Sequence, residues 1–326
     1  MPPVVTRGLP PRTSDRMVNP GGSALIGGVM MMNGDRVSAA VRLPDGTVRV
    51  EELAPVAVVP WARVARRVPF VRGLAALTTS LTASVAALLW SARASGTNEA
   101  EVARLSSRRA TRIGAIAFAV VVSVVPFWAI YAVVSRIGGG PLAAGAAEVA
   151  LRLAILGGYL WAVGRWDRIA DVFAYHGAEH KTIACYEAGD PLVPAVVAGH
   201  SRFHPRCGTA FAFWAVMVVS AVGAASGDLG PATGAAVRMG ALIVAVGVGY
   251  EIVRAGTKAG RTPLGRALQA PGLAMQHLTT REPRLDQLET AIAALRSCAT
   301  DAQRDDIDAA IAGWLGAGVG PVTVDA

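Results

Sequence analysis

Long runs of uncharged, apolar residues constrain the fold of this chain more than any other feature. Residues 113–135 carry no charge, and residues 207–227 form a second uncharged stretch. Residues 141–164 and 231–253 are nearly as apolar, although the former contains Glu148 and Arg152 and the latter Arg238. Each run is long enough to cross ~30 Å of hydrocarbon. The sequence therefore predicts a mainly α, polytopic membrane protein with about four transmembrane helices.

The basic residues between these runs predict how the chain is oriented. The loop of residues 165–206 carries Arg165, Arg168, Lys181, Arg202 and Arg206, whereas residues 228–230 carry no base. A second basic group follows the last run, from Arg254 onward. Because basic loops stay in the cytoplasm, we expect both termini and the 165–208 loop there, in the cell (inner) membrane. The net charge of +8 is then explained by anionic lipid, and no nucleic-acid partner is expected.

Polar segments flank the expected membrane domain of residues 111–270. Residues 1–20 are rich in proline and arginine and are expected to be disordered. Within residues 21–60, two strand-like runs flank Asp45-Gly46, which predicts a β-hairpin in a small β-rich cytosolic unit. In residues 61–110, the leucines of 73–92 lie at helical spacing, which favours an interfacial or packed amphipathic helix over a span. Residues 271–326 predict a helical cytosolic tail.

Histidines are rare in this chain, yet four of its five lie between residues 176 and 204. The stretch "AYHGAEHKTIACYE" predicts a helix that ends near Gly189, with His176 and His180 on one face. The order His-x-x-Glu-His matches the inverted zinc-peptidase signature, in which both histidines bind zinc and Glu179 activates water. The simpler alternative is a pair of histidines that hydrogen-bond to backbone carbonyls.

A second cluster, "HSRFHPRCGTAF", adds further candidate ligands. Four ligands, His176, His180, His204 and Cys207, would close a structural tetrahedron, whereas three of them plus water would leave a catalytic position open. Glu251, expected at the same membrane face, is another candidate ligand. His200 is expected to be a solvated loop residue, Cys185 and Cys298 to be buried helix residues, and His277 to have no role.

The charged residues inside the spans need partners, because an unpaired charge in the membrane is costly. A Glu148–Arg152 or a Glu148–Arg238 pair is the simplest interpretation, and a proton or ion path is the alternative.

Four segments together resemble the YqhQ-like family of bacterial membrane proteins: "GGSALIGGVMM", "YHGAEHKTIACYE", "SRFHPRCGTAF" and "PGLAMQHLTTREP". The resemblance covers Gly21 to Leu295. It implies a multi-span membrane protein with a metal site at His176, Glu179, His180, His204 and Cys207, in a domain of unknown function commonly labelled a predicted metal-dependent enzyme. The chain departs from the family pattern at Gly27, where the family usually carries a glutamate.

Three functions follow as hypotheses. The first is a membrane-embedded, zinc-dependent hydrolase at the cytoplasmic face, acting on an unknown membrane-proximal substrate with Glu179 as general base. The second is a non-enzymatic scaffold or assembly factor with a structural His/Cys zinc site. A transporter that uses Glu148, Arg152 and Arg238 is a third, for which the spans supply few ionisable residues.

Overall fold

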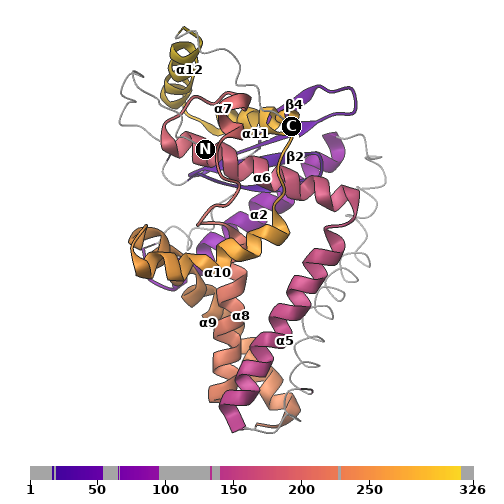
Figure 1. Ribbon diagram of the computed structural model, residues 1–326, viewed down its shortest axis with the longest axis vertical. Coiled ribbons are helices and arrows are strands. Elements are labelled where there is room, and N and C mark those ends of the chain that lie inside the picture. The colour runs from indigo at the N-terminus through magenta and orange to yellow at the C-terminus, as the bar shows by residue number, and fades with distance from the viewer. Residues whose placement is uncertain are drawn as a thin grey trace.

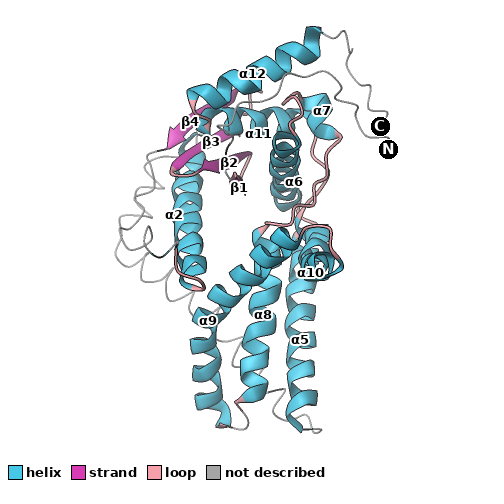
Figure 2. Ribbon diagram, turned by 90° about the vertical axis from the view of Figure 1, so that its left-hand side faces the viewer, coloured by secondary structure: helices cyan, strands magenta, loops and turns pink. Residues whose placement is uncertain are grey.

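The computed structural model describes residues 17, 20–53, 65, 67–94, 133, 140–226 and 229–316. The predicted span at 113–135 and the predicted disordered N-terminus lie outside these ranges, apart from single positions. Three long helices run side by side: α5 (Gly140–Val163), α8 (Gly208–Ala225) and α9 (Gly230–Ala259). The sheet gathers at one end of this bundle together with four helices, α6 (Asp167–Ala188), α7 (Pro194–Ala198), α11 (Leu285–Cys298) and α12 (Asp301–Gly316); α10 (Pro263–Thr279) lies between the two parts (Figures 1 and 2).

Within the described residues, four helices are long and apolar enough to cross a membrane: Val71–Ala94, Ala143–Val163, Gly208–Ala225 and Met239–Ala259. Three of them match predicted spans. The remaining helix, α2 (Val71–Ala94), was not predicted as a span; its N-terminal half contacts α9, and its C-terminal half packs on the sheet through Ala83, Ala87 and Trp90. The packed face consists of small residues and Trp90, whereas the leucines at helical spacing, such as Leu81 and Leu88, are exposed, so the packing does not use the predicted leucine face. The length and composition of α2 also permit a span.

The N-terminal sheet is an antiparallel meander in the order β1-β2-β3-β4. Its strands are β1 (Gly21–Leu25), β2 (Gly28–Asn33), β3 (Arg36–Arg42) and β4 (Val48–Leu53). The predicted hairpin joins β3 to β4, and Gly46 adopts the positive φ (86°) that the turn requires. Asp45 Oδ1 accepts a hydrogen bond from the Thr47 N–H at 2.9 Å and closes the same turn.

The central strands β2 and β3 are largely buried on both faces, whereas the edge strand β4 is mostly exposed. Alternate side chains of a strand point to opposite sides of the sheet. Val29 and Met31 of β2 pack with α6 and α11, whereas Met30 between them packs with α2. The apolar run "GVMMM" therefore reflects a strand with two covered faces. The β-rich segment shares its cores with helices from the middle and the end of the chain.

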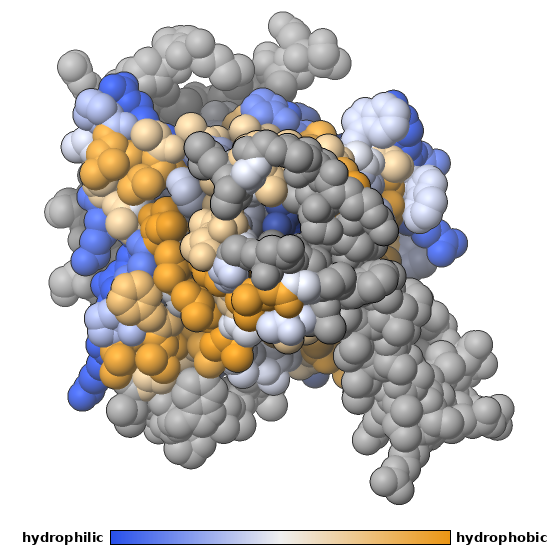
Figure 3. Space-filling model, turned by 90° about the horizontal axis from the view of Figure 1, so that it is seen from below, coloured by the Kyte–Doolittle hydropathy of each residue, from blue (hydrophilic) through white to orange (hydrophobic). Residues whose placement is uncertain are grey.

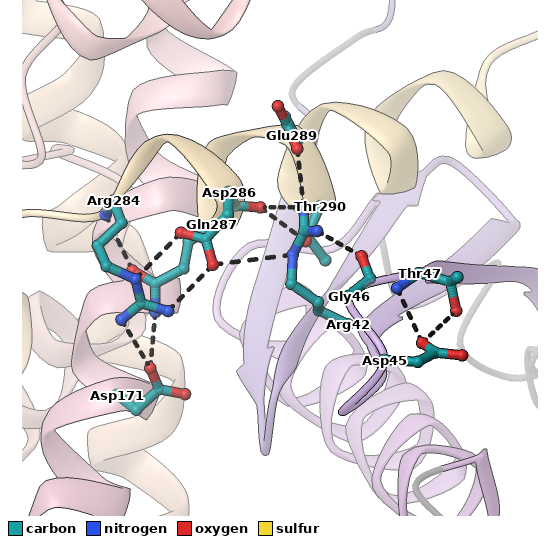
Figure 4. A network of polar contacts seen from close by, with 10 residues as sticks. All are labelled: Arg42, Asp45, Gly46, Thr47, Asp171, Arg284, Asp286, Gln287, Glu289 and Thr290. Carbon is teal, nitrogen blue, oxygen red and sulfur yellow. Dashed lines mark hydrogen bonds and ion pairs between the residues drawn. The ribbon is translucent and has the colours of Figure 1, made fainter.

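The tail begins with α11 (Leu285–Cys298), which a polar network ties to the sheet and to α6 (Figure 4). Arg42 of β3 donates to the Asp286 carbonyl and to Glu289 Oε2, each at 2.8 Å. Gln287 donates to Asp171 of α6 at 2.8 Å. After α11 come residues 301–316, which form α12 (Asp301–Gly316). The contacts of Arg42 and Gln287 fasten α11 onto the sheet and onto α6. The described part of the tail is helical in α11 and α12.

The ionisable residues within α5 pair with each other. Arg152 donates to Glu148 Oε1 at 2.7 Å, one helical turn away, and both side chains are almost fully buried. This is one of the two pairings that the sequence predicted. The side chain of Arg238 lies outside the described part of the structure.

Candidate metal centre on helix α6

The central helix of the site is α6 (Asp167–Ala188), which carries both motif histidines. Asp167 in its first turn complements the positive end of the helix dipole. The helix ends at Gly189, which adopts a left-handed conformation (φ 88°) as C-cap, as the sequence predicted. His176 and His180 are neighbours on one face, with ring centroids 4.4 Å apart.

Backbone carbonyls fix the orientation of both imidazole rings. His176 Nδ1 lies 2.8 Å from the Thr279 carbonyl oxygen, and His180 Nδ1 lies 2.6 Å from that of Arg202. A carbonyl can only accept, so Nδ1 carries the proton in each ring and Nε2 keeps its lone pair. Metal-binding histidines are usually held in this way by the nitrogen that does not bind the metal. The carbonyl contacts of the simpler alternative are thus present, and they leave Nε2 available on both rings.

Cys207 supplies the third donor atom. It is the N-cap residue of α8. Its Sγ lies 3.3 Å from His176 Nε2 and accepts a hydrogen bond from Thr209 Oγ1 at 3.2 Å. The donor atoms of His176, His180 and Cys207 all lie within 4.8 Å of one another, close enough to share a metal ion.

Two glycines allow the backbones around the site to approach closely. A Cβ on Gly177 of α6 would lie 2.1 Å from the Arg281 carbonyl oxygen, in the segment that follows α10 (Pro263–Thr279). A Cβ on Gly272 of α10 would lie 2.2 Å from Ala210 Cβ in the first turn of α8. These close contacts bring Thr279 to His176 and bring the start of α8 to α10.

Glu179 lies between the two histidines in the sequence and is almost fully buried. Burial raises the pKa of its carboxyl to about 7, although the nearby His176 opposes the shift. The carboxylate forms no hydrogen bond or ion pair with the described residues. Strand β1 packs closely against it, since a Cβ on Gly22 would lie 2.9 Å from Glu179 Cγ. The site therefore holds a proton-exchanging group in a secluded position.

His204 lies beside the three-donor cluster, with its ring 5.6 Å from that of His180. Its Nε2 lies 3.4 Å from Glu187 Oε2, and its Nδ1 accepts from the Arg206 backbone N–H at 3.4 Å. Burial lowers the pKa of His204, with the Glu187 carboxylate opposing the shift. Because both ring nitrogens have partners, His204 adds no free donor in this arrangement.

Glu251 is not brought together with the histidines. Its carboxylate forms a two-point ion pair with Arg72 of α2, with Nε–Oε1 at 2.6 Å, and accepts from the Phe70 backbone N–H at 3.1 Å. Phe70 has a positive φ (65°), which aims its N–H into this contact at the start of α2. The structure therefore gives Glu251 a role in joining α2 to α9, and we leave it out of the ligand set.

The remaining histidines and cysteines of the sequence analysis lie outside the three-donor cluster. His200 is not simply solvated, because its Nε2 lies 3.1 Å from Asp190 Oδ2. His277 packs against the ring of Phe203. Cys185 and Cys298 are fully buried, as predicted.

Sequence reasoning missed the contributions of Thr279 and Arg202, which act through their backbone carbonyls. Every residue carries a backbone carbonyl, so no pattern of side chains could have identified these two. Gly177 did carry a signal, since a glycine inside a helix often marks a close backbone approach.

Gly27, where the resembling family has a glutamate, lies in the turn between β1 and β2 with φ 72°. This turn is held by Ser91 of α2, which donates to the Ile26 carbonyl at 3.0 Å. A Cβ at position 27 would meet only the Arg42 carbonyl oxygen, at 3.7 Å, so this position is not part of the three-donor cluster.

The fold and the site define a chain with four membrane-compatible helices, a small sheet and a buried His/Cys cluster. The profile of the family described as "Protein of unknown function (DUF1385)" matches residues 68–301, which is most of the chain. The chain therefore belongs to this family. It is also 29% identical over 288 residues to the uncharacterized protein YqhQ of Bacillus subtilis (strain 168), an alignment that covers 83% of this chain and 89% of that protein. No solved structure matches.

Proposed function

We propose that this protein is a membrane-embedded, metal-dependent hydrolase that works at the cytoplasmic face. His176, His180 and Cys207 hold the metal, and Glu179 is the general base. The observation that carries the proposal is the three donor atoms within 4.8 Å, with both imidazoles oriented by carbonyls at Nδ1. A structural role for two histidines alone would not require a thiol against His176 Nε2.

The chemistry of the donors fits zinc. Neutral imidazole and thiolate are the ligands that zinc prefers, and three protein ligands leave one position open for water or substrate. When bound, zinc would act as a Lewis acid toward a substrate carbonyl or phosphoryl oxygen and would acidify water.

The residues of the chain account for the proton transfer. Glu179 accepts the proton of the attacking water and returns it to the leaving group. Its pKa of about 7 lets it exchange a proton near neutral pH, which suits a general base. Its burial under β1 keeps bulk water from competing for the carboxylate.

The location of the site restricts the substrate. Cys207 immediately precedes α8, so the metal site lies at the end of a membrane-compatible helix. The sheet, α6 and the tail helices lie at this same end (Figure 1). The basic loop charges favour the cytoplasm for this end, with both termini on that side. The substrate is then a group at the membrane surface, either a peptide bond near the bilayer or a lipid-linked group.

The metal is tested first, by elemental mass spectrometry on detergent-purified protein. We expect about one zinc per chain, lost in His180→Ala. His277→Ala is the matched control, because it removes a histidine outside the cluster and should keep zinc. A wild-type protein that is folded but free of metal would refute the proposal.

The catalytic role is tested by Glu179→Gln, which keeps the shape of the side chain and removes its basicity. Zinc should remain, while hydrolysis of a responding substrate from a panel of lipid-linked and peptide substrates should fall by roughly 10²–10⁴-fold. Equal loss of zinc and activity would contradict a base role.

A structural zinc site is the second candidate, because His204 lies close enough to His180 to become a fourth ligand after a ring rotation. In that case His204→Ala would release zinc and unfold the protein together. The proposed hydrolase instead predicts that His204→Ala keeps its zinc.

A further inference from the structure

Five exposed basic residues lie where the bundle meets the sheet-bearing end, and none of them pairs with a carboxylate of the described residues. Both junctions, from α5 to α6 and from α9 to α10, lie at that end of the bundle (Figures 1 and 2). We call the group the basic collar; its members are Arg165, Arg168, Lys258, Arg261 and Arg266.

The arginines farther from the bundle behave differently. Arg284, Arg296 and Arg304 of the tail each have an aspartate oxygen within 3.0 Å. The charges of the tail are therefore neutralised within the protein. The collar residues have no such carboxylate partner among the described residues.

Aromatic residues accompany the collar at the α5–α6 junction. Trp161 and Trp166 are 58% and 66% exposed. The guanidinium carbon of Arg165 lies 3.2 Å from the centroid of the Trp161 ring, an arrangement that holds the charge over the aromatic face. Tryptophan prefers the level of lipid headgroups, where its ring is apolar and its N–H is solvated. An exposed tryptophan pair beside unpaired arginines is typical of a protein surface at this level.

The surface below the collar is apolar. Viewed from the bundle end, the described surface shows a broad hydrophobic region with hydrophilic residues toward its rim (Figure 3). Leu264, between Arg261 and Arg266, is 64% exposed. Leu264 thus places an exposed apolar side chain between two bases, as expected where acyl chains meet charged headgroups.

We infer that the basic collar binds the headgroups of anionic phospholipids in the leaflet that faces the sheet-bearing end. The unpaired charge selects an anionic partner, and the adjacent apolar and aromatic surface selects a lipid over a free phosphate or a nucleic acid. This inference rests on membrane insertion of the bundle and is independent of the metal site.

The test compares two variants of the full chain that remove the same number of charges. Arg165→Gln/Arg168→Gln removes two collar residues, and Arg296→Gln/Arg304→Gln removes two exposed, paired arginines as the control. Each detergent-purified, delipidated protein is titrated with phosphatidylglycerol or phosphatidylcholine, and bound lipid is counted by native mass spectrometry. Thermal melting without lipid shows that each variant is folded.

We expect wild type and the tail control to bind phosphatidylglycerol in preference to phosphatidylcholine. The collar variant should lose affinity for phosphatidylglycerol by roughly fivefold per cation removed. A second variant, Lys258→Gln/Arg261→Gln, should lose it similarly and serves if the first fails to fold.

Three results would overturn the inference. The first is equal binding of the two lipids, and the second is an equal loss of affinity in the collar and tail variants. The third is a soluble polyphosphate that binds the protein as well as phosphatidylglycerol does and displaces it. A protein that stays soluble without detergent would instead refute membrane insertion. None of these results bears on zinc content, so a failure of the lipid inference is distinguishable from a failure of the proposed metal site.

Discussion

Gly177→Ala is the substitution that most directly tests how the site is assembled. In a helix interior, glycine to alanine normally stabilises by about 1 kcal/mol, because alanine loses less backbone entropy on folding. Here the new Cβ would lie 2.1 Å from the Arg281 carbonyl oxygen, a backbone atom that cannot move without displacing the segment after α10. The sign of the effect therefore depends on the tertiary contact.

The magnitude follows from the contacts that the displacement would break. Overpacking costs about 1–3 kcal/mol. The Arg281 N–H donates to the Phe173 carbonyl at 2.8 Å, and His176 Nδ1 bonds to the Thr279 carbonyl; losing each costs about 1 kcal/mol. Some of the overpacking is relieved as these bonds break. After the helix-propensity gain, we expect a net destabilisation of about 2 kcal/mol, or roughly 3 °C in Tm for a chain of this length.

The assay is thermal melting of the detergent-purified protein, with zinc content measured on the same samples. Gly158→Ala is the control, because a Cβ on this helical glycine of α5 meets no described atom within 4 Å. It should leave Tm unchanged or raise it slightly. Gly177→Ala should lower Tm and weaken zinc binding, since the ring of His176 loses its carbonyl partner. An unchanged or raised Tm for Gly177→Ala would refute the close crossing of α6 by this segment.

Three further predictions concern individual side chains, one of them beside the site. Burial raises the pKa of Cys298 to about 12, so its thiol should resist iodoacetamide at pH 8 in the native protein and react only after denaturation, as peptide mapping would show. Burial would raise the pKa of Glu187, but hydrogen bonds from its histidine and arginine partners outweigh it and lower the pKa to about 2. Its contribution to stability is then present above its ordinary pKa and disappears as pH falls toward 2, so the Tm difference between wild type and Glu187→Gln should shrink below about pH 4.5. Finally, Glu251→Gln should lower Tm through the loss of its ion pair with Arg72 and leave zinc content unchanged; loss of zinc would restore Glu251 as a ligand.

Much of the local structure could be predicted from the sequence. The hairpin at Asp45-Gly46 and the helix end at Gly189 depend on residues that tolerate positive φ, and both are confirmed. The helices that correspond to residues 141–164, 207–227 and 231–253 follow from long apolar runs with few charged residues. The structure does not describe the predicted span at 113–135. These features were predictable because they depend on neighbouring residues along the chain.

In the candidate site, too, local spacing along the chain could be predicted from the sequence, whereas contacts between distant segments could not. The four-residue spacing of His176 and His180 places them on one helix face, so the sequence alone predicted that pair. The sequence also offered Cys207, His204 and Glu251 as equivalent partners, because each is chemically able to bind zinc. Only the tertiary structure separates them: Cys207 contacts His176, whereas the other two have partners of their own.

The sequence by itself determined an apolar, multi-helix chain with one histidine-bearing helix, since hydropathy, turn residues and helical spacing act over a few residues. The tertiary structure decided which side chains meet. Thr279 lies 103 positions from His176, and a carbonyl at that separation has no signature in the sequence. The sheet likewise shares its cores with α6 and α11 because both of its faces are apolar and must be covered. Contacts between distant segments depend on packing of the whole chain, and they fix the geometry of the candidate metal centre.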